Sequence, residues 1–224
     1  MTYVFHFGEI LNDWPDLVLG AWLTIRLSAM AMGLGLIVAI VCALGKTMGP
    51  RPVRLMVDVY VEVIRNSPFL VQIFLIFFGL PRAGIRLDAN VAALIALTVN
   101  LGAYATEIVR AGIETIHKGQ IEAGLALGLK PLQIFTKIVL FPALKAIYPS
   151  LTSQFILLML TSSVVSAISA EELTAIANNL QAQTFRSFEI YIIVTLMYLA
   201  MSLMFSGLFA IIYKLVFART DIAR

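Results

Sequence analysis

Few side chains in this chain have the types and spacing that catalysis or metal binding requires. The tripeptide Gly45-Lys46-Thr47 matches the end of a phosphate-binding loop, but Ile40 stands where that motif has its first glycine. His6 and His117 lie far apart, without cysteines or paired carboxylates near them. We therefore predict no catalytic residue, no nucleotide site and no metal site in this chain.

The most distinctive polar pattern is the segment 121–145, IEAGLALGLKPLQIFTKIVLFPALK, which lies between two long apolar runs. Gly128 divides it into two short helices. The first helix is amphipathic, because Glu122 faces away from an apolar stripe at helical spacing that consists of Ile121, Leu125 and Leu129. Such a helix fits either a groove on a partner protein or the lipid interface.

The composition places the elements around this segment in a membrane. The chain has 224 residues, of which 60% are hydrophobic and 13% charged, against about 45–50% and about 25% in soluble domains. The run Leu27–Gly45 holds nineteen residues without a charge, and a membrane span needs about 20. We predict an all-α membrane protein that forms a single transmembrane domain over residues 1–224, with five spans at 17–45, 66–86, 89–110, 144–168 and 190–217.

The second of these spans has an unusual approach. The segment Arg54–Arg65 is apolar on one side but carries Asp58 and Glu62. We expect it to lie as an amphipathic helix on the membrane surface, before the chain enters the span at about residue 66.

Basic residues predict the orientation of the five spans. With the C-terminus inside, twelve of the sixteen lysines and arginines lie in cytoplasmic segments, namely Lys46, Arg51, Arg54, Arg65, Arg110, Lys118, Lys130, Lys137, Lys145, Lys214, Arg219 and Arg224. Only Arg82, Arg86 and Arg186 lie outside, and Arg26 falls in the first span. The positive-inside rule therefore puts the N-terminus outside and the loop at 111–142 in the cytoplasm. The pI near 9.1 reflects these loops and does not indicate a nucleic acid partner.

The cytoplasmic segment resembles the signature loop of permease subunits in ATP-binding-cassette (ABC) importers. That signature reads Glu-Ala-Ala, three residues, Gly, nine residues, then Ile-x-Leu-Pro. The residues that keep its register are Glu122, Ala123, Gly128, Ile138 and Leu140. Two positions depart from it, because Gly124 replaces the second alanine and the proline comes one residue late, at Pro142.

Three further blocks narrow the resemblance to the polar amino acid branch of these permeases. They are Tyr60–Pro81, Gly102–Leu129 and Thr161–Leu173. The resemblance covers the chain from about Gly20 to Tyr213. It implies a multi-pass protein of the bacterial cytoplasmic (inner) membrane.

In that family the short cytoplasmic helix sits in a cleft of an ATPase subunit and transmits its motion to the spans. The residues that the resemblance assigns to this coupling are Gln120, Ile121, Glu122, Ala123, Gly124, Leu125, Gly128 and Leu129. We expect the apolar stripe of Ile121, Leu125 and Leu129 to supply the buried contact with the ATPase, and Glu122 a polar contact.

The resemblance also implies a set of partners. They are a second permease subunit, identical or related, two cytoplasmic ABC ATPase subunits, and an extracytoplasmic solute-binding protein, with an amino acid as the substrate and lipid around the spans. ATP and Mg²⁺ would be bound by the ATPase, so no cofactor is expected in this chain.

Polar residues in the third and fourth spans are candidates for lining the substrate pathway. They are Asn100 and Tyr104 on the third span, and Gln154, Thr161 and Ser162 on the fourth. Polar side chains inside a bilayer tend to face the interior of the bundle. The alternative is that they form hydrogen bonds between helices.

The fourth span also bears on the substrate. Before Thr161-Ser162 the family often has lysine or glutamine followed by aspartate, but this chain has Met159 and Leu160. An acid there could hold a cationic side chain, so its absence argues against lysine, arginine or histidine as the substrate.

Two acids follow the fourth span on the outer side. Glu171 and Glu172 are candidates for docking the solute-binding protein. Ser169 and Glu172 also have the spacing of a capping box, which would make Glu172 a helix cap instead.

Two other functions remain open at this point. The same machinery could carry another small polar solute, such as an opine, or the chain could be an independent channel or secondary carrier. The last three spans have no central charge, which argues against a carrier, because proton and sodium pathways generally use intramembrane carboxylates or broken helices.

Overall fold

The structure is a computed structural model that describes residues 5–217, and within this range every regular element is a helix. The α-helices are α1 (Phe7–Leu11), α2 (Trp14–Met48), α3 (Arg51–Arg65), α4 (Phe69–Phe74), α5 (Ala89–Glu114), α6 (Lys118–Ala126), α7 (Pro131–Ile134), α8 (Leu140–Thr161), α9 (Leu173–Thr184) and α10 (Ser187–Phe217). The prediction of an all-α fold is confirmed. Arg219 and Arg224, which entered the charge count, lie outside the described residues.

Four helical stretches among the described residues are long and apolar enough to cross a membrane. They are α2, α5, the continuous stretch Pro131–Ile168 and α10, and they overlap four of the five predicted spans. The fifth prediction, at 66–86, corresponds to a broken element. Here α4 continues through a π-helix (Leu75–Gly79) and a 3₁₀-helix (Leu80–Ala83), and this stretch is bent by 109° from α3.

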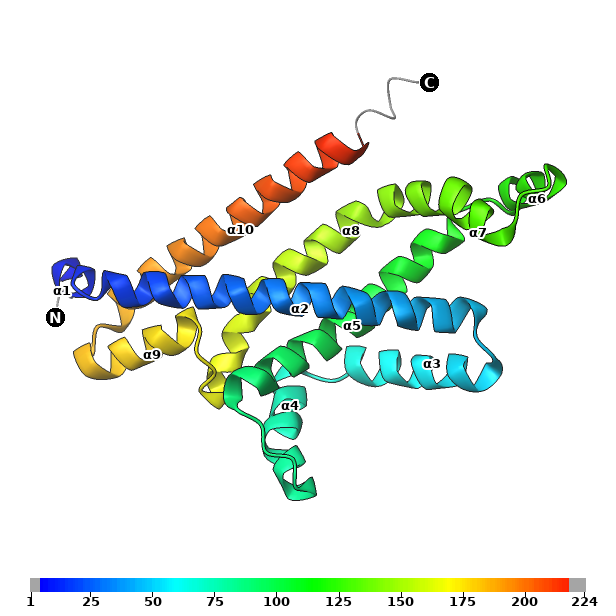
Figure 1. Cartoon of the computed structure of the whole chain (residues 1–224). Coiled ribbons are helices and arrows are strands. Elements are labelled where there is room, and N and C mark those ends of the chain that lie inside the picture. The colour runs from blue at the N-terminus through cyan, green and yellow to red at the C-terminus, as the bar shows by residue number, and fades with distance from the viewer. Residues whose placement is uncertain (1–4, 218–224) are drawn as a thin grey trace.

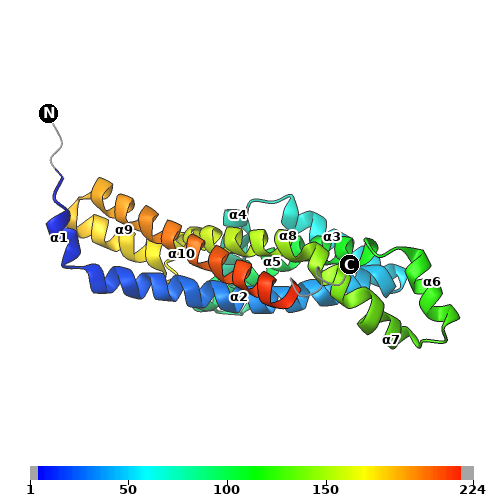
Figure 2. The ribbon, with the colours of Figure 1, turned by 90° about the horizontal axis from the view of Figure 1, so that it is seen from above.

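The helices form an elongated bundle with a different set of short helices at each end. In Figure 1, α2 runs along the length of the molecule, with α5 and α8 beside it. Helices α1 and α9 lie at one end, and α6 and α7 at the other. Figure 2 shows the same two ends from above. The segment that resembles the coupling loop is therefore at the end opposite α1.

Small residues bring α2 and α5 together at the centre of this bundle. A Cβ atom on Gly35 would lie 2.8 Å from Leu101 Cδ2, and one on Gly102 would lie 2.7 Å from Val38 Cγ1. In apolar surroundings, side chains this small let two helix backbones approach closely and gain van der Waals contact. The α2–α5 pair is therefore the frame on which the other helices are placed.

Helix α3, which was predicted to lie on the membrane surface, packs against this frame. It lies alongside α2 and α5 (Figure 1), with Val57 and Val61 buried. The Tyr60 hydroxyl donates a hydrogen bond of 2.6 Å to the carbonyl of Val99 on α5. The apolar side of an amphipathic helix can be covered by lipid or by protein. Here α2 and α5 cover Val57 and Val61, whereas Leu55, Met56, Val59 and Val63 of α3 stay exposed.

The sharp bend after α3 is held by one buried glutamine. The Gln72 amide nitrogen lies 2.7 Å from the Ile64 carbonyl and 3.0 Å from the Ser67 carbonyl, so it satisfies backbone acceptors that the helix break leaves free. Its amide oxygen accepts a hydrogen bond of 3.0 Å from Asn100 on α5.

Helix α6 ends in a Schellman motif at Gly128. The Leu129 N–H donates to the Gly124 carbonyl at 3.1 Å, and the Gly128 N–H donates to the Leu125 carbonyl at 2.9 Å. Gly128 has φ of +73°, in the left-handed region that glycine adopts without steric cost. Its predicted role as the break between the two short helices is confirmed.

A π-helix explains how the late proline is accommodated. The π-helix Phe135–Val139 joins α7 to α8, just before Pro142. A π-bulge adds one residue to a helix without changing the helix that follows. The additional residue before the proline is thus absorbed within the helix, and α8 continues as a regular span.

We predict that Gly128→Val destabilises α6 without unfolding the bundle. A β-branched residue with positive φ costs roughly 1–3 kcal/mol, although the space around Gly128 is open. Limited proteolysis should cut the variant faster within 118–130, while the thermal unfolding temperature of the whole chain stays close to that of wild type. The control is Gly119→Ala, since Gly119 also faces open space but has no positive φ. Equal cleavage of wild type and Gly128→Val would contradict this prediction.

Candidate functional sites: the α6 segment, the α5–α8 groove and the ionic cluster

Helix α6 turns its predicted apolar stripe inward. Ile121 and Leu129 pack on a small cluster at the end of the bundle, whose buried members are Ile116, Ile134, Val139 and Ala143. Of the stripe, only Leu125 is mainly exposed, at 55%. Ile121 and Leu129 thus hold α6 against α7 and α8 while remaining partly exposed, and their contact with the ATPase stays a prediction.

The exposed face of α6 is made of other residues. It presents Gln120, Glu122, Ala123, Leu125, Ala126 and Leu127. Leu127 is 81% exposed, and it was missed in the sequence because it does not belong to the stripe. An acid beside small and apolar exposed side chains forms a surface that a partner protein can cover.

The glycine that departs from the signature lies on the inner face of α6. Gly124 is buried, and a Cβ atom there would come 2.8 Å from Ile138 Cδ1 and 3.2 Å from Ile134 Cγ1. The absence of a side chain thus lets the α6 backbone approach α7 and the π-helix. The departure is explained by packing within this chain rather than by a partner.

Two predicted pathway residues share a groove between α5 and α8. The groove has a volume of about 420 Å³, and Tyr104 and Gln154 both line it. Its polar lining is completed by Arg65, Glu107, Thr115 and Ser150. The Arg65 guanidinium lies 5.5 Å from the centre of the Tyr104 ring, a cation–π distance.

The other three predicted pathway residues are engaged elsewhere. The Asn100 amide donates to Gln72 at the bend, as described above. The Thr161 hydroxyl donates to the Leu157 carbonyl at 2.8 Å, and the fully buried Ser162 hydroxyl donates to the Met159 carbonyl at 2.6 Å. In this conformation Asn100 makes the hydrogen bond between helices that was the alternative for these residues, whereas Thr161 and Ser162 bond to carbonyls of their own helical stretch.

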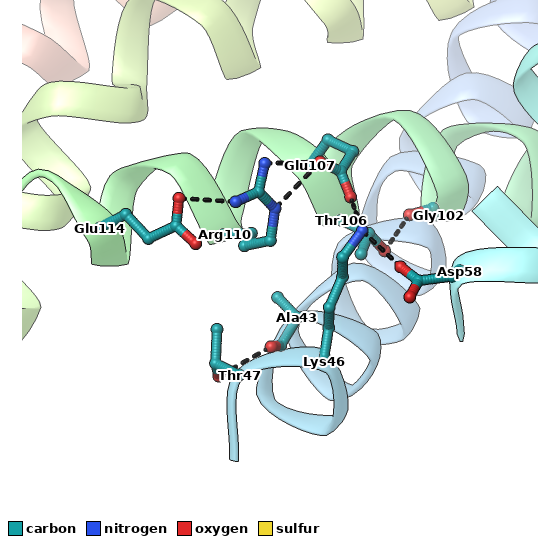
Figure 3. A network of polar contacts seen from close by, with 9 residues as sticks. All are labelled: Ala43, Lys46, Thr47, Asp58, Gly102, Thr106, Glu107, Arg110 and Glu114. Atoms are coloured by element: carbon teal, nitrogen blue, oxygen red, sulfur yellow. Dashed lines mark hydrogen bonds and ion pairs between the residues drawn. The ribbon is translucent and has the colours of Figure 1, made fainter. Parts of the chain in front are cut away.

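An ionic cluster joins three helices at the α6 end of the bundle (Figure 3). Lys46 on α2 lies 2.7 Å from Asp58 on α3 and 2.7 Å from Glu107 on α5. Arg110 also pairs with Glu107, at 2.9 Å, and with Glu114, at 2.6 Å. Glu107 is thus shared by two cations, and its side chain is only 20% exposed.

The sequence analysis did not find this cluster as a site. In the sequence, Lys46 stood out as one of the basic residues that predict the orientation and as part of the tripeptide Gly45-Lys46-Thr47, which lies within α2 and forms no phosphate-binding loop. The one available signal was Glu107 and Arg110, an acid and a base three residues apart at the end of a span. Lys46 and Glu107 are 61 residues apart in the sequence, so local spacing cannot predict their ion pair.

The two acids after the fourth span have different environments. Glu172 is fully buried as the N-cap of α9, where its carboxylate accepts hydrogen bonds from Ala175 N at 2.8 Å and from the Tyr198 hydroxyl at 2.6 Å. Glu171 is exposed. Ser169 has φ of 60° and does not cap the helix, so the Ser169–Glu172 capping box is wrong, whereas the cap itself is present with Glu172 alone.

Burial raises the pKa of the Glu172 carboxyl above its ordinary value, and its hydrogen bonds only partly oppose this. A raised folded-state pKa favours folding below the unfolded pKa near 4.5, and this contribution is lost as the pH rises through the folded-state pKa. Glutamine does not titrate, so the Glu172→Gln variant should not lose this stability as the pH rises. The free energy of unfolding of the variant, relative to that of wild type, should therefore increase from pH 5 to pH 8.

Thermal unfolding of detergent-solubilised protein at both pH values measures this effect. Glu172→Ala serves as the comparison, because it removes the cap and leaves the Tyr198 hydroxyl without its acceptor. It should cost about 2 kcal/mol at either pH. A Glu172→Gln variant that follows wild type at both pH values would show that Glu172 does not titrate in this window.

Comparison with known proteins identifies the family. A family model described as the binding-protein-dependent transport system inner membrane component matches residues 31–218. The glutamine transport system permease protein GlnP of Escherichia coli (strain K12) is 35% identical over 204 residues, which cover 90% of this chain and 93% of that protein. The L-cystine transport system permease protein TcyB of Bacillus subtilis (strain 168) is 38% identical over 170 residues, 76% of this chain and 73% of that protein.

A solved structure agrees with these relatives. A crystal structure of an amino acid ABC transporter with histidines contains a chain that is 34% identical and superposes with a TM-score of 0.87, covering 95% of this chain and 99% of that chain. The resemblance to permeases of polar amino acid importers that the sequence showed is thereby confirmed. This chain belongs to the family of binding-protein-dependent transport system inner membrane components.

Proposed function

We propose that this chain is the membrane-spanning subunit of an ABC importer for amino acids. Two copies of this fold, identical or related, would form one pathway. The observation that carries the proposal is the exposed face of α6, which presents the acid and the alanine of the coupling signature beside Leu125 and Leu127. An isolated carrier has no use for such a surface.

Energy would enter through that face. Two cytoplasmic ATPase subunits would bind ATP and Mg²⁺ and hydrolyse the ATP, and this chain would hydrolyse nothing. Ile121 and Leu129 fasten α6 to α7 and to the π-helix before α8, so α6 and the start of α8 form one packed unit. A displacement of α6 by the ATPase would then move α8 as a rigid body, which is how packed helices transmit a switch.

The proposed topology has five spans, with α3 and the stretch after it forming the second. The N-terminus would be outside and α6 in the cytoplasm, in the inner membrane of a bacterium. Support comes from the predicted bias of lysine and arginine toward the segments on the α6 side. A solute-binding protein would dock at the opposite end, where Glu171 is the exposed acid of the predicted pair.

The proposed substrate is an amino acid with an uncharged polar side chain. Met159 is fully buried and Leu160 is apolar, so the position at which the family often has an aspartate offers no charge to a cationic substrate. Glutamine, the substrate in the name of one relative, has such a side chain, whereas another relative of similar identity is named for arginine. The groove that Tyr104 and Gln154 line is the candidate path.

The test is reconstitution of the chain with an ABC ATPase and a solute-binding protein from the same organism. Proteoliposomes should take up glutamine or cystine only when ATP and the binding protein are both present, and should take up arginine at least tenfold more slowly. Uptake by the chain alone, without ATPase, would establish an independent carrier and refute the importer. ATP-driven uptake of a solute other than an amino acid would refute the proposed substrate class but not the importer function.

A further inference from the structure

A second groove lies between α2 and α5, far from α6. It has a volume of about 260 Å³ and contains one cation and one acid, Arg26 of α2 and Glu171 of the segment before α9. The remaining lining is mostly apolar and consists of Leu23, Leu27, Met30, Asn90, Val91 and Leu94. The proposed coupling and translocation use none of its α2 residues.

The depth of this groove follows from helix geometry. Twenty residues separate Arg26 from Lys46 in the uninterrupted helix α2, which corresponds to about 30 Å at 1.5 Å per residue. That is the thickness of the hydrocarbon core. Asn90 likewise precedes Arg110 by twenty residues within α5. If the ionic cluster marks one boundary of the core, Arg26 and Asn90 mark the other, at the level of the lipid headgroups.

The groove is built by side-chain hydrogen bonds from three segments. The Asn90 side-chain oxygen accepts a hydrogen bond of 2.7 Å from the backbone N–H of Glu171. Two residues further, the Leu173 N–H donates to the Thr24 hydroxyl of α2 at 3.0 Å. The segment that carries Glu171 is thus fastened to both helices beside Arg26.

Both charges of the groove are available to a ligand. Among the described residues, no hydrogen bond or ion pair engages the Arg26 guanidinium or the Glu171 carboxylate. Arg26 is exposed, and Met30 and Leu34 continue its side of α2, each 45% exposed. An arginine at the edge of a hydrocarbon core extends its guanidinium into the headgroup layer, where lipid phosphates are the anions within reach.

We propose that this groove binds a phospholipid whose headgroup carries both a phosphate and a primary ammonium, of the phosphatidylethanolamine type. The Arg26 guanidinium would hold the phosphate through charge-assisted hydrogen bonds. The Glu171 carboxylate would accept hydrogen bonds from the ammonium, and an acyl chain would lie along Met30 and Leu94. The lipid would belong to the leaflet on the Arg26 side, which is extracytoplasmic in the proposed orientation.

A free amino acid also carries an anion and an ammonium, but the apolar side of this groove favours the lipid. The groove continues into the exposed apolar face of α2 toward the middle of the membrane, and a free amino acid has no acyl chain to cover that face. The role assigned here to Glu171 competes with docking of the binding protein. A lipid-binding measurement in the absence of binding protein separates the two.

The experiment is native mass spectrometry of the delipidated full-length chain, titrated with phosphatidylethanolamine, phosphatidylglycerol or phosphatidylcholine. Wild type should bind phosphatidylethanolamine most tightly. Arg26→Gln should weaken all three lipids about tenfold, because each offers a phosphate. Glu171→Gln should weaken phosphatidylethanolamine about tenfold but leave phosphatidylglycerol unchanged or tighter.

Two controls accompany these variants. Arg82→Gln removes an exposed arginine outside the groove and should leave binding of all three lipids unchanged. Arg26→Lys keeps the positive charge and should retain most of the binding if Arg26→Gln does not fold. Equal affinity of wild type for the three lipids would overturn the proposal on wild type alone.

Two further results would also overturn it. If Glu171→Gln lowers the affinity for phosphatidylethanolamine and phosphatidylglycerol equally, the Glu171 carboxylate does not bind the ammonium group. Displacement of bound lipid by millimolar glutamine would assign the groove to solute. Neither result would bear on ATP-driven uptake, so failure of this proposal is distinguishable from failure of the importer function.

Discussion

The double variant Glu122→Lys, Leu127→Asp is expected to abolish association with the ATPase and ATP-driven uptake while leaving the permease folded. Both side chains are exposed on α6 and neither contacts the bundle. The substitutions reverse one charge and place another in the most exposed apolar position of the face. Charged groups buried without a partner at an interface cost several kcal/mol, so binding should fall at least a hundredfold.

Co-purification of the ATPase with tagged permease, followed by uptake in proteoliposomes, measures this effect. The matched control is Asp16→Lys, which reverses an exposed charge at the opposite end of the molecule and should retain the ATPase. A second comparison is Ile121→Ala, which removes packing inside the chain and should lower thermal stability before it affects association. If Ile121→Ala releases the ATPase from a fully stable permease, the exposed face was assigned incorrectly.

The second large effect is expected at Glu107. Glu107→Gln removes the carboxylate that Lys46 and Arg110 share and leaves both cations with fewer partners (Figure 3). Exposed ion pairs contribute up to about 1 kcal/mol, and breaking a buried pair costs roughly 3–5 kcal/mol. Since Glu107 is 20% exposed, we expect a loss of about 2 kcal/mol in the free energy of unfolding.

Asp58→Asn is the matched control, because Asp58 pairs with the same lysine but is 47% exposed. It should cost less than about 1 kcal/mol. Chemical or thermal unfolding in detergent compares the two variants, and a double-mutant cycle of Lys46→Met with Glu107→Gln gives their coupling. A larger loss from Asp58→Asn than from Glu107→Gln would mean that α3 rather than α5 depends on the cluster.

The membrane class of this protein follows from local patterns alone. An uncharged apolar run such as Leu27–Gly45 is long enough to cross a membrane, where a helix satisfies its backbone hydrogen bonds. Its helical structure and its membrane location can therefore be predicted without reference to any other segment. The break at Gly128 is equally local, since a single residue with positive φ ends the helix. The coupling signature was readable because it keeps its register within twenty residues.

The orientation of amphipathic helices was not determined by the sequence. The stripe of Ile121 and Leu129 and the apolar side of α3 are both expected to be shielded from water. A sequence pattern does not distinguish whether lipid, a partner protein or another part of the same chain shields them. The tertiary structure placed Ile121 and Leu129 against α7 and α8, and it buried Val57 and Val61 of α3 against α2 and α5.

Contacts between residues distant in the sequence were likewise decided only by the tertiary structure. The sequence shows that Arg26 is a charge within a span, but it does not show that Glu171 lies beside it. Hydrogen bonds from Asn90 and Thr24 hold the segment of Glu171 in that place. Lys46 and Glu107 meet for the same reason, since α2 and α5 pack through glycines that bring their ends level. Helix formation and membrane insertion depend on neighbouring residues, whereas the charges that meet depend on how the helices pack.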